Sequence, residues 1–199
     1  MHPNPAFAWT DRDEMLAFLA AASFSTIIAV GSDQPALVHA PVAVGGKDRV
    51  RFHISKNNRA VAAFESGRAL LSCVGPHVYV SPDWYGTDDQ VPTWNYVAVE
   101  CEGAVSRMAD EALPSLLDDL SAAQERLLLP KPAWTRDKMS PDRWKAMLRA
   151  IVGFEMGIET IRGTRKLGQH KREAERAGAA AGVEKAGNPE MAALMRAAT

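Results

Sequence analysis

The sequence lacks the marks of an exported, disulfide-bonded or membrane-spanning protein. Only two of its 199 residues are cysteines, Cys73 and Cys101, and their wide spacing suggests neither a disulfide framework nor a metal site. No segment approaches the roughly 20 consecutive apolar residues that a membrane-spanning helix needs. The N-terminus has no basic start followed by an apolar run, so we expect no signal peptide, no membrane partner and a cytoplasmic protein.

An excess of charge of one sign is also missing. With 23 basic and 24 acidic side chains, the net charge of −1 gives no global attraction to nucleic acid or to an anionic membrane, and only local patches could provide one. Nucleophile-elbow, Walker and dinucleotide-binding motifs are absent as well. Motifs therefore assign no catalytic residue.

Hydrophobic patterns and turn residues predict a mainly β protein with helices, of the α+β class. The predicted strands, in chain order, are FSTIIAV (24–30), PALVHAPVAV (35–44), RVRFHIS (49–55), RALLSCVG (68–75), HVYVS (77–81), TWNYVAVECEGAVSRM (93–108) and VGFEMGIETIRG (152–163). The predicted helices are 12–22, 59–66, 110–129, 142–151 and a helical tail. We expect one closed or half-closed antiparallel barrel, with residues 1–199 forming a single domain and residues 172–199 a helical C-terminal extension.

Turn residues at Gly31-Ser32-Asp33 and at Gly45-Gly46-Lys47-Asp48 indicate hairpins between the first three strands. A candidate phosphate site follows the third strand at Ser55-Lys56-Asn57-Asn58, where a strand ends and a helix begins. Backbone N–H groups, a hydroxyl and an ammonium group converge there, as an anion requires. The alternative is a plain helix cap with a solvated Lys56.

Residues 77–96 hold all three tyrosines and two of the five tryptophans, beside Pro82, Gly86 and Pro92. Aromatic side chains that gather where the chain turns form a core plug, a dimer seam or a platform for a planar ligand. The strand with Ala40 and Pro41 would let a flat ring approach the backbone closely.

A basic segment at residues 162–172 includes Gly168, which permits a sharp turn. It could close over an anionic ligand, or form a solvated loop, or bind nucleic acid. His39, His53 and His77 lie on predicted strands without the short spacing of metal ligands, so we predict no metal site.

Three segments in order, SKNNRAV, HVYVSPDWY with VPTWNYVAVECEG, and RKLGQHK, resemble the PaiB family of FMN-binding proteins, usually labelled negative transcriptional regulators. The resemblance extends from the first predicted helix to the closing NPEMAALMR. It implies an FMN-binding split barrel and a homodimer with two flavins at the subunit interface.

The resemblance also implies which residues bind FMN. Ser55, Lys56 and Asn57 would lie near the phosphate, and His39, Ala40 and Pro41 along the isoalloxazine ring. The remaining members of the implied site are His53, Trp94, Asn95, Tyr96, Lys166 and Gln169. The resemblance leaves open which subunit supplies residues 94–96.

Two departures from the family pattern concern the implied site. Gly168 and His170 stand where the late motif usually has serine and asparagine, so we expect different hydrogen bonding at that edge. His53 lies in Phe-His-Ile-Ser rather than in the usual Gly-His-Xaa-Ala-like run.

The resemblance leaves three hypotheses for function. The first is an FMN-binding split-barrel protein of the PaiB type; the family label implies DNA binding, which neither charge nor a recognition-helix motif supports. The second is a flavin-dependent oxidoreductase, FMN reductase-like, with no direct DNA role, in which Tyr85, Tyr96 and His39 are the candidate acid–base residues. The third is a haem-binding or haem-degrading split barrel.

Overall fold

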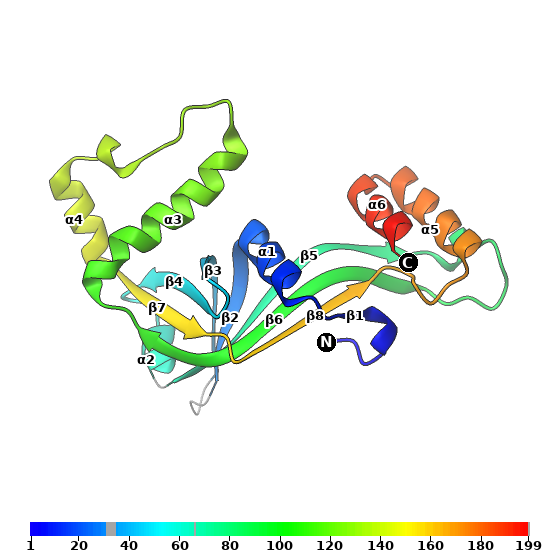
Figure 1. Cartoon of the computed structure of the whole chain (residues 1–199), viewed down its shortest axis with the longest axis horizontal. Helices are drawn as coiled ribbons and strands as arrows, with labels where there is room; N and C mark the ends of the chain where they lie inside the picture. The colour runs from blue at the N-terminus through cyan, green and yellow to red at the C-terminus, as the bar shows by residue number, and fades with distance from the viewer. Residues whose placement is uncertain (31–34, 66, 199) are drawn as a thin grey trace. The chain divides into compact units, whose positions relative to one another are not determined.

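The computed structural model describes residues 1–30, 35–65 and 67–198, so the predicted turn at Gly31-Ser32-Asp33 lies outside the described residues. Eight strands form a sheet in the order β1-β8-β6-β5-β2-β3-β4-β7. They are β1 (Ala8–Trp9), β2 (Phe24–Val30), β3 (Ala36–Gly45), β4 (Arg49–Ser55), β5 (Arg68–Val80), β6 (Thr93–Arg107), β7 (Ile151–Gly157) and β8 (Thr160–Lys166) (Figure 1). A further pairing of β6 with β7 closes six of these strands into a ring.

The helices confirm the predicted α+β class, including the helical tail. They are α1 (Arg12–Ala22), α2 (Ala60–Glu65), α3 (Leu113–Glu125), α4 (Pro141–Arg149), α5 (Glu173–Lys185) and α6 (Pro189–Ala197). Short 3-10 helices are η1 (Pro5–Phe7), η2 (Pro82–Tyr85), η3 (Asp110–Ala112), η4 (Arg126–Leu128) and η5 (Arg136–Lys138). In the described part of the chain, no helix is long and apolar enough to cross a membrane.

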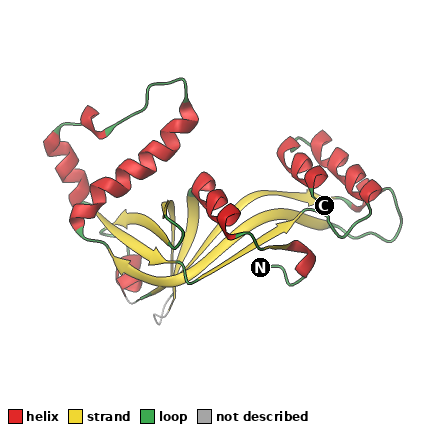
Figure 2. Cartoon of the chain, in the orientation of Figure 1, coloured by secondary structure: helices red, strands yellow, loops and turns green. Residues whose placement is uncertain are grey.

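The described residues divide into two compact units. Unit 1 comprises Met1–Asp11, Val74–Val99 and the chain from Arg162 onward, and unit 2 comprises Arg12–Cys73 and Glu100–Ile161. The strands of unit 2 wrap around a common core (Figure 2) because alternate residues of each strand point inward. The prediction that the chain folds as a single domain stays a prediction.

Three phenylalanines fill the core of unit 2. Phe52 of β4, Phe64 of α2 and Phe154 of β7 are fully buried, and their ring centroids lie 5.3–5.6 Å apart. Phe52 and Phe154 are direct partners in the β4–β7 pairing. Ring contacts at this spacing add to the stabilisation from burial alone, so this cluster anchors both strands and the short helix.

The helical tail packs within unit 1. Helices α5 and α6 contact each other, and α5 also packs on η2. Gly182 makes this possible, because a Cβ atom there would lie 2.4 Å from the ring of Trp84. The buried apolar side chains of the tail are small or flexible: Ala179, Ala180, Val183, Met191, Ala192 and Met195.

Three predicted boundaries were wrong. Strand β5 runs unbroken through Pro76, where the sequence suggested two strands, so proline does not end a strand here. The predicted strand 152–163 is instead β7 and β8, because Ile158 and Glu159 turn away and donate to the carbonyls of Asp48 and Glu102. The predicted helix 110–129 is η3, α3 and η4 in succession.

Gly103 of β6 should be intolerant of a side chain. A Cβ atom there would lie 1.6 Å from the carbonyl oxygen of Gly157, so Gly103→Ala should lower the free energy of unfolding by about 3 kcal/mol. The matched control is Gly157→Ala, whose added methyl meets nothing within 4 Å and should change stability by less than about 1 kcal/mol. Urea unfolding measures both; equal midpoints for the two variants would contradict the close approach.

Candidate functional site

The outer face of β2 and β3 in unit 2 carries rings that the chain leaves uncovered. The side chain of Phe24 is 63% exposed and Leu37 is 50% exposed. The Phe24 and His39 rings stack at 6.4 Å between centroids with 23° between planes, and His39 Nδ1 shares a hydrogen bond of 3.1 Å with the hydroxyl of Thr26. Pro41 is the cross-strand partner of Phe24. The face thus presents a flat aromatic surface.

The predicted trio His39, Ala40 and Pro41 divides between the two faces of β3. Ala40 is buried and points into the core, whereas His39 is exposed and Pro41 is partly exposed. This follows from the alternation of side chains along a strand. Only His39 and Pro41 therefore offer side chains to a molecule on the outer face.

His53 of β4 has a buried nitrogen without a partner. It lies opposite Gly153 of β7, and among the described residues nothing hydrogen-bonds its Nδ1 atom. Burial lowers the pKa of the imidazole below its ordinary value, so His53 is neutral at neutral pH. A neutral, half-buried imidazole with a free nitrogen is suited to a hydrogen bond with a ligand or water.

The turn after β4 uses its own backbone N–H groups. Lys56 donates to Ala150 O at 2.9 Å, Asn57 to Ser55 Oγ at 3.3 Å and Asn58 to Ser55 O at 3.0 Å. Asn58 Oδ1 accepts from the N–H of residue 60 at 2.9 Å, which caps α2. An anion at this turn would therefore be held by side chains rather than by these backbone groups.

The side chain of Lys56 lies near two cationic side chains that the sequence analysis did not select. It lines a pocket of about 350 Å³ together with Lys145 and Arg149 of α4, and its Nζ lies 4.0 Å from Asp110 Oδ2. Lys145 and Arg149 are one helical turn apart and share a face. That i, i+4 spacing was visible in the sequence, but only the fold brings α4 to the end of β4.

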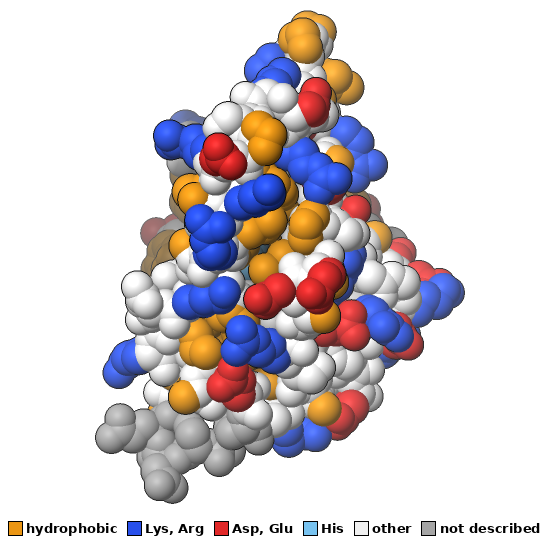
Figure 3. Space-filling view, turned by 90° about the vertical axis from the view of Figure 1, so that its left-hand side faces the viewer, with side chains coloured by type: hydrophobic (Ala, Val, Ile, Leu, Met, Phe, Trp, Pro, Cys, Tyr) orange, Lys and Arg blue, Asp and Glu red, His pale blue; other side chains and the backbone are white. Residues whose placement is uncertain are grey.

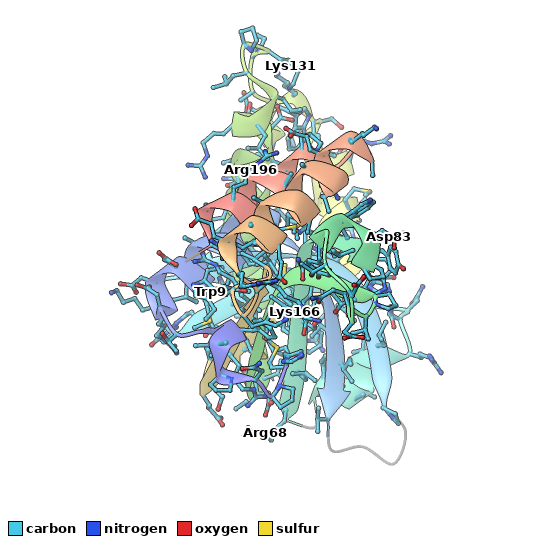
Figure 4. All side chains as sticks on the ribbon, turned by 90° about the vertical axis from the view of Figure 1, so that its right-hand side faces the viewer. Trp9, Arg68, Asp83, Lys131, Lys166 and Arg196 are labelled. Atoms are coloured by element: carbon cyan, nitrogen blue, oxygen red, sulfur yellow. The ribbon has the colours of Figure 1, made fainter. Side chains whose placement is uncertain are left out.

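In unit 1 the basic segment and the aromatic segment lie side by side. Lys166 Nζ bonds to Thr93 Oγ1 at 2.5 Å, and Lys171 Nζ to Gln90 Oε1 at 2.5 Å. Lys171 also lies over the ring of Tyr85 at 4.8 Å from its centroid. Lys166 is labelled in Figure 4. Partial burial lowers the pKa of its ammonium group. The two segments expected to meet around a ligand are thus neighbours.

Gln169 and His170 shape the loop after β8. Gln169 accepts from the N–H of Leu167 at 2.8 Å and donates to Arg165 O at 2.6 Å, so both ends of its amide brace the loop. His170 packs edge-on against Phe7, with 5.2 Å between ring centroids. Burial, then the charges of nearby lysines, lowers the pKa of His170.

Asn95 of β6 is buried without hydrogen bonds. It is 1% exposed, and neither amide atom has a partner among the described residues. Gly168 faces it: a Cβ atom at Gly168 would lie 3.9 Å from Asn95 Nδ2, and the glycine has φ +90°, which disfavours side chains. Gly168, which has no hydroxyl, therefore lies beside this unsatisfied amide.

Trp94, the neighbour of Asn95, points outward. It is 55% exposed and contacts His77 at 6.1 Å and Tyr79 at 6.2 Å between ring centroids. Tyr96 is partly exposed on the same strand. Tyr85, in contrast, is buried under Lys171, and burial raises its pKa, so it serves packing in unit 1. In the described ranges, no cluster of three or more metal-ligating side chains occurs.

Residues 1–160 match the model of a family described as "Putative FMN-binding domain". The chain belongs to this FMN-binding family. The "Protease synthase and sporulation protein PAI 2" of Bacillus subtilis is 31% identical over 171 residues, which make up 84% of this chain and 81% of that protein. The resemblance to the PaiB family and the prediction of FMN as cofactor are confirmed.

Solved structures confirm the split-barrel fold. The "FAD and Heme binding protein" of Mycobacterium smegmatis matches with a TM-score of 0.58 and 18% identity, over 80% of this chain and 73% of that one. The flavocytochrome Anf3 of Azotobacter vinelandii matches with a TM-score of 0.58 and 16% identity, over 83% of this chain and 72% of that one. At these identities the likeness shows the fold alone.

One structural observation, independent of the family match, indicates that residues of this chain fit a flavin. In the described chain, three residues have buried side-chain nitrogen or oxygen atoms without a hydrogen-bond partner: Ser25, His53 and Asn95. Two of them, His53 and Asn95, belong to the set that the resemblance implied. Buried polar atoms are usually paired with protein groups or ordered water, so His53 and Asn95 each have capacity to bind a ligand or a water molecule.

Glu175 of α5 should make unit 1 sensitive to acid. It accepts from Thr87 Oγ1 at 3.1 Å and from Arg172, whose hydrogen bonds hold its pKa at about 2, below the ordinary 4.5. This stabilisation is complete above about pH 4.5 and is lost as pH falls towards 2. Glu175→Gln should therefore lower the thermal midpoint at pH 7 and match the parent near pH 2.

The control for this prediction is Glu173→Gln, which changes an exposed glutamate in the first turn of the same helix. Thermal unfolding of all three proteins from pH 7 to pH 2 is the measurement. A deficit of Glu175→Gln that stays constant across this range would contradict the role of its charge.

Proposed function

We propose that this protein is a homodimer that binds FMN at its subunit interface and acts through the bound flavin. The observations that carry the proposal are orphaned polar groups at positions implied as flavin contacts, His53 Nδ1 in unit 2 and, separately, the amide of Asn95 in unit 1. The flavin ring presents carbonyl oxygens and ring nitrogens that pair with such groups. Bound FMN supplies one- and two-electron redox chemistry.

The outer face of β2 and β3 is the proposed seat of the flavin ring. Phe24, His39 and Pro41 give it a flat surface of conjugated and apolar groups, which suits a planar aromatic ligand. The Thr26 hydroxyl holds the His39 ring in place through the 3.1 Å hydrogen bond. Fixing the ring in advance reduces the ordering cost of binding.

The phosphate is the proposed ligand of the pocket at Lys56. Three cations, Lys56, Lys145 and Arg149, line it, and Ser55 adds a hydroxyl at the adjacent strand end. Asp110 and Glu111 line the same pocket and reduce its positive potential. Three cations against two carboxylates still leave a net attraction for a phosphate.

A second subunit is the proposed cover for the rest of the outer face. On this face Ile28 of β2 pairs with Leu37 of β3 on one side and with Leu70 of β5 on the other. These side chains form an apolar row that is partly or fully exposed. Contiguous apolar surface of this kind is characteristic of homodimer interfaces.

The regulatory role is proposed to run through the flavin rather than through direct DNA contact. The net charge of −1 supplies no general attraction to DNA. Addition of NAD(P)H tests for redox activity, because reduction of the bound flavin bleaches its visible absorption. Binding of DNA that weakens as salt rises would instead favour direct contact. The cytoplasmic location stays a prediction.

Titration with FMN tests the cofactor site. We expect the purified protein to bind FMN and to release it on denaturation. Lys56→Met should weaken FMN binding about tenfold or more, because one charge-assisted hydrogen bond contributes roughly 1.5–3 kcal/mol. Binding of riboflavin, which has no phosphate, should be unaffected by Lys56→Met.

The matched control is Lys138→Met, which removes an exposed lysine outside the pocket. Equal loss of FMN and riboflavin in Lys56→Met would contradict the phosphate assignment. A Soret band in place of flavin absorption would favour the haem alternative.

The dimer proposal is tested by making the outer face polar. Phe24→Ser with Leu37→Ser removes two exposed apolar side chains, so the fold should survive while the dimer dissociates. Sedimentation equilibrium should report the monomer mass, and FMN affinity should fall with it. Met147→Ser, at an exposed site on α4, is the control and should stay dimeric. A double variant that remains dimeric would show that another surface joins the subunits.

A further inference from the structure

Two lysines of unit 1 have only uncharged partners. Lys166 Nζ lies 2.5 Å from the hydroxyl oxygen of Thr93. Lys171 Nζ lies 2.5 Å from the amide oxygen of Gln90 and 4.8 Å from the centroid of the Tyr85 ring. Both lysines are partly buried, and among the described residues no carboxylate pairs with either ammonium group. Charges that leave bulk water are usually paired with an opposite charge, so both groups have capacity for an anion.

Other cations of the chain do have carboxylate partners. In unit 2, Arg51 pairs with Asp119 at 2.6 Å and Arg136 with Asp118 at 3.4 Å. Figure 3, which views the side of α3 and α4, shows Lys and Arg side chains among Asp and Glu side chains. The two lysines of unit 1 differ from these cations because their partners carry no negative charge.

The two ammonium groups converge on one short stretch of the aromatic segment. Their partners, Gln90 and Thr93, are three residues apart in the sequence. Burial, followed by the charges of Lys171 and Lys166, lowers the pKa of His170, so both charges act on the same imidazole. The fold therefore brings two positive charges into one neighbourhood, where a single anion can contact both.

The carboxylates of this region do not neutralise the two lysines. Glu175 is buried and accepts hydrogen bonds from Thr87 and Arg172, so Arg172 compensates its charge. Asp88 and Asp89 of the aromatic segment are exposed to solvent. Residues 165–176 carry five cations, Arg165, Lys166, Lys171, Arg172 and Arg176, against Glu173 and Glu175. The local balance of charge is positive and favours a bound anion.

We propose that Lys166 and Lys171 bind the oxyanion group, phosphate or carboxylate, of the molecule that exchanges electrons with the flavin. This placement rests on the proposed function, in which the orphaned amide of Asn95 is a flavin contact. A Cβ atom at Gly168, between the two lysines in sequence, would lie 3.9 Å from Asn95 Nδ2. Thr93 and Asn95 are two residues apart on β6 and point to the same face, so Lys166 also lies on the side of that amide. Ammonium groups form strong charge-assisted hydrogen bonds with oxyanions, so the substrate class is a small organic anion.

Titration of the full chain, followed in its amide NMR spectrum with and without saturating FMN, tests the proposal. Inorganic phosphate and acetate are the probes, each compared with chloride at equal ionic strength, and the tighter of the two identifies the oxyanion group. We expect the FMN-loaded protein to bind at least one probe more tightly than chloride. Lys166→Met and Lys171→Met should each weaken that binding about tenfold, because a charge-assisted hydrogen bond is lost. Lys171→Arg should retain most of the binding, since the positive charge stays.

Lys185→Met is the matched control, because Lys185 is an exposed lysine of unit 1 outside the basic segment. It should bind the probes as the parent does. The proposal is overturned if neither probe binds more tightly than chloride, or if both methionine variants of the basic segment bind like the parent. It is also overturned if FMN displaces the probes, since the lysines would then hold the FMN phosphate. Absence of FMN binding would overturn the proposed function and the anion's role as reaction partner, whereas lysine-dependent binding of the probes would still show that the oxyanion site exists.

Discussion

Closure of the barrel in unit 2 governs the rest of the site. Pairing of β6 with β7 completes the ring, and each strand then turns one row of side chains inward, around Phe52, Phe64 and Phe154. Alternation sends the other row outward. On β2 and β3 that outer row includes Phe24, Leu37 and His39, which no helix of the described chain covers. The same periodicity that builds the core therefore creates the surface on which we place flavin and partner.

In unit 1, side-chain contacts hold the basic segment and α5 against the aromatic segment. Glu175, Lys171 and Lys166 each tie the basic segment or α5 to residues of the aromatic segment. These are charge-assisted contacts between residues far apart in sequence, and the glycines of α5 let Trp84 approach the helix. Among these paired groups, the amide of Asn95 has no hydrogen-bond partner within the described chain, so it has capacity to bind a ligand or water.

Much of the fold and part of the site could be predicted from local pattern. Period-two alternation identified nearly every strand, and the Asn-Pro-Glu start identified α6, whose Asn188 side chain accepts from the N–H of Met191. The resemblance placed Asn95 and His53 near FMN. Local pattern failed where a distant group decides: the backbone N–H of Lys56 looked free, yet it donates to the carbonyl of Ala150.

The sequence by itself determined the class of fold, the family and the cofactor, because alternation, turn residues and motif order are local properties of a chain. Only the tertiary structure decided which of the predicted residues have capacity to bind. It showed Ala40 turned into the core, and Lys145 and Arg149 beside Lys56. It also showed that Lys166 and Lys171 have uncharged partners. Pairing and burial depend on neighbours distant in sequence, and a linear pattern does not contain them.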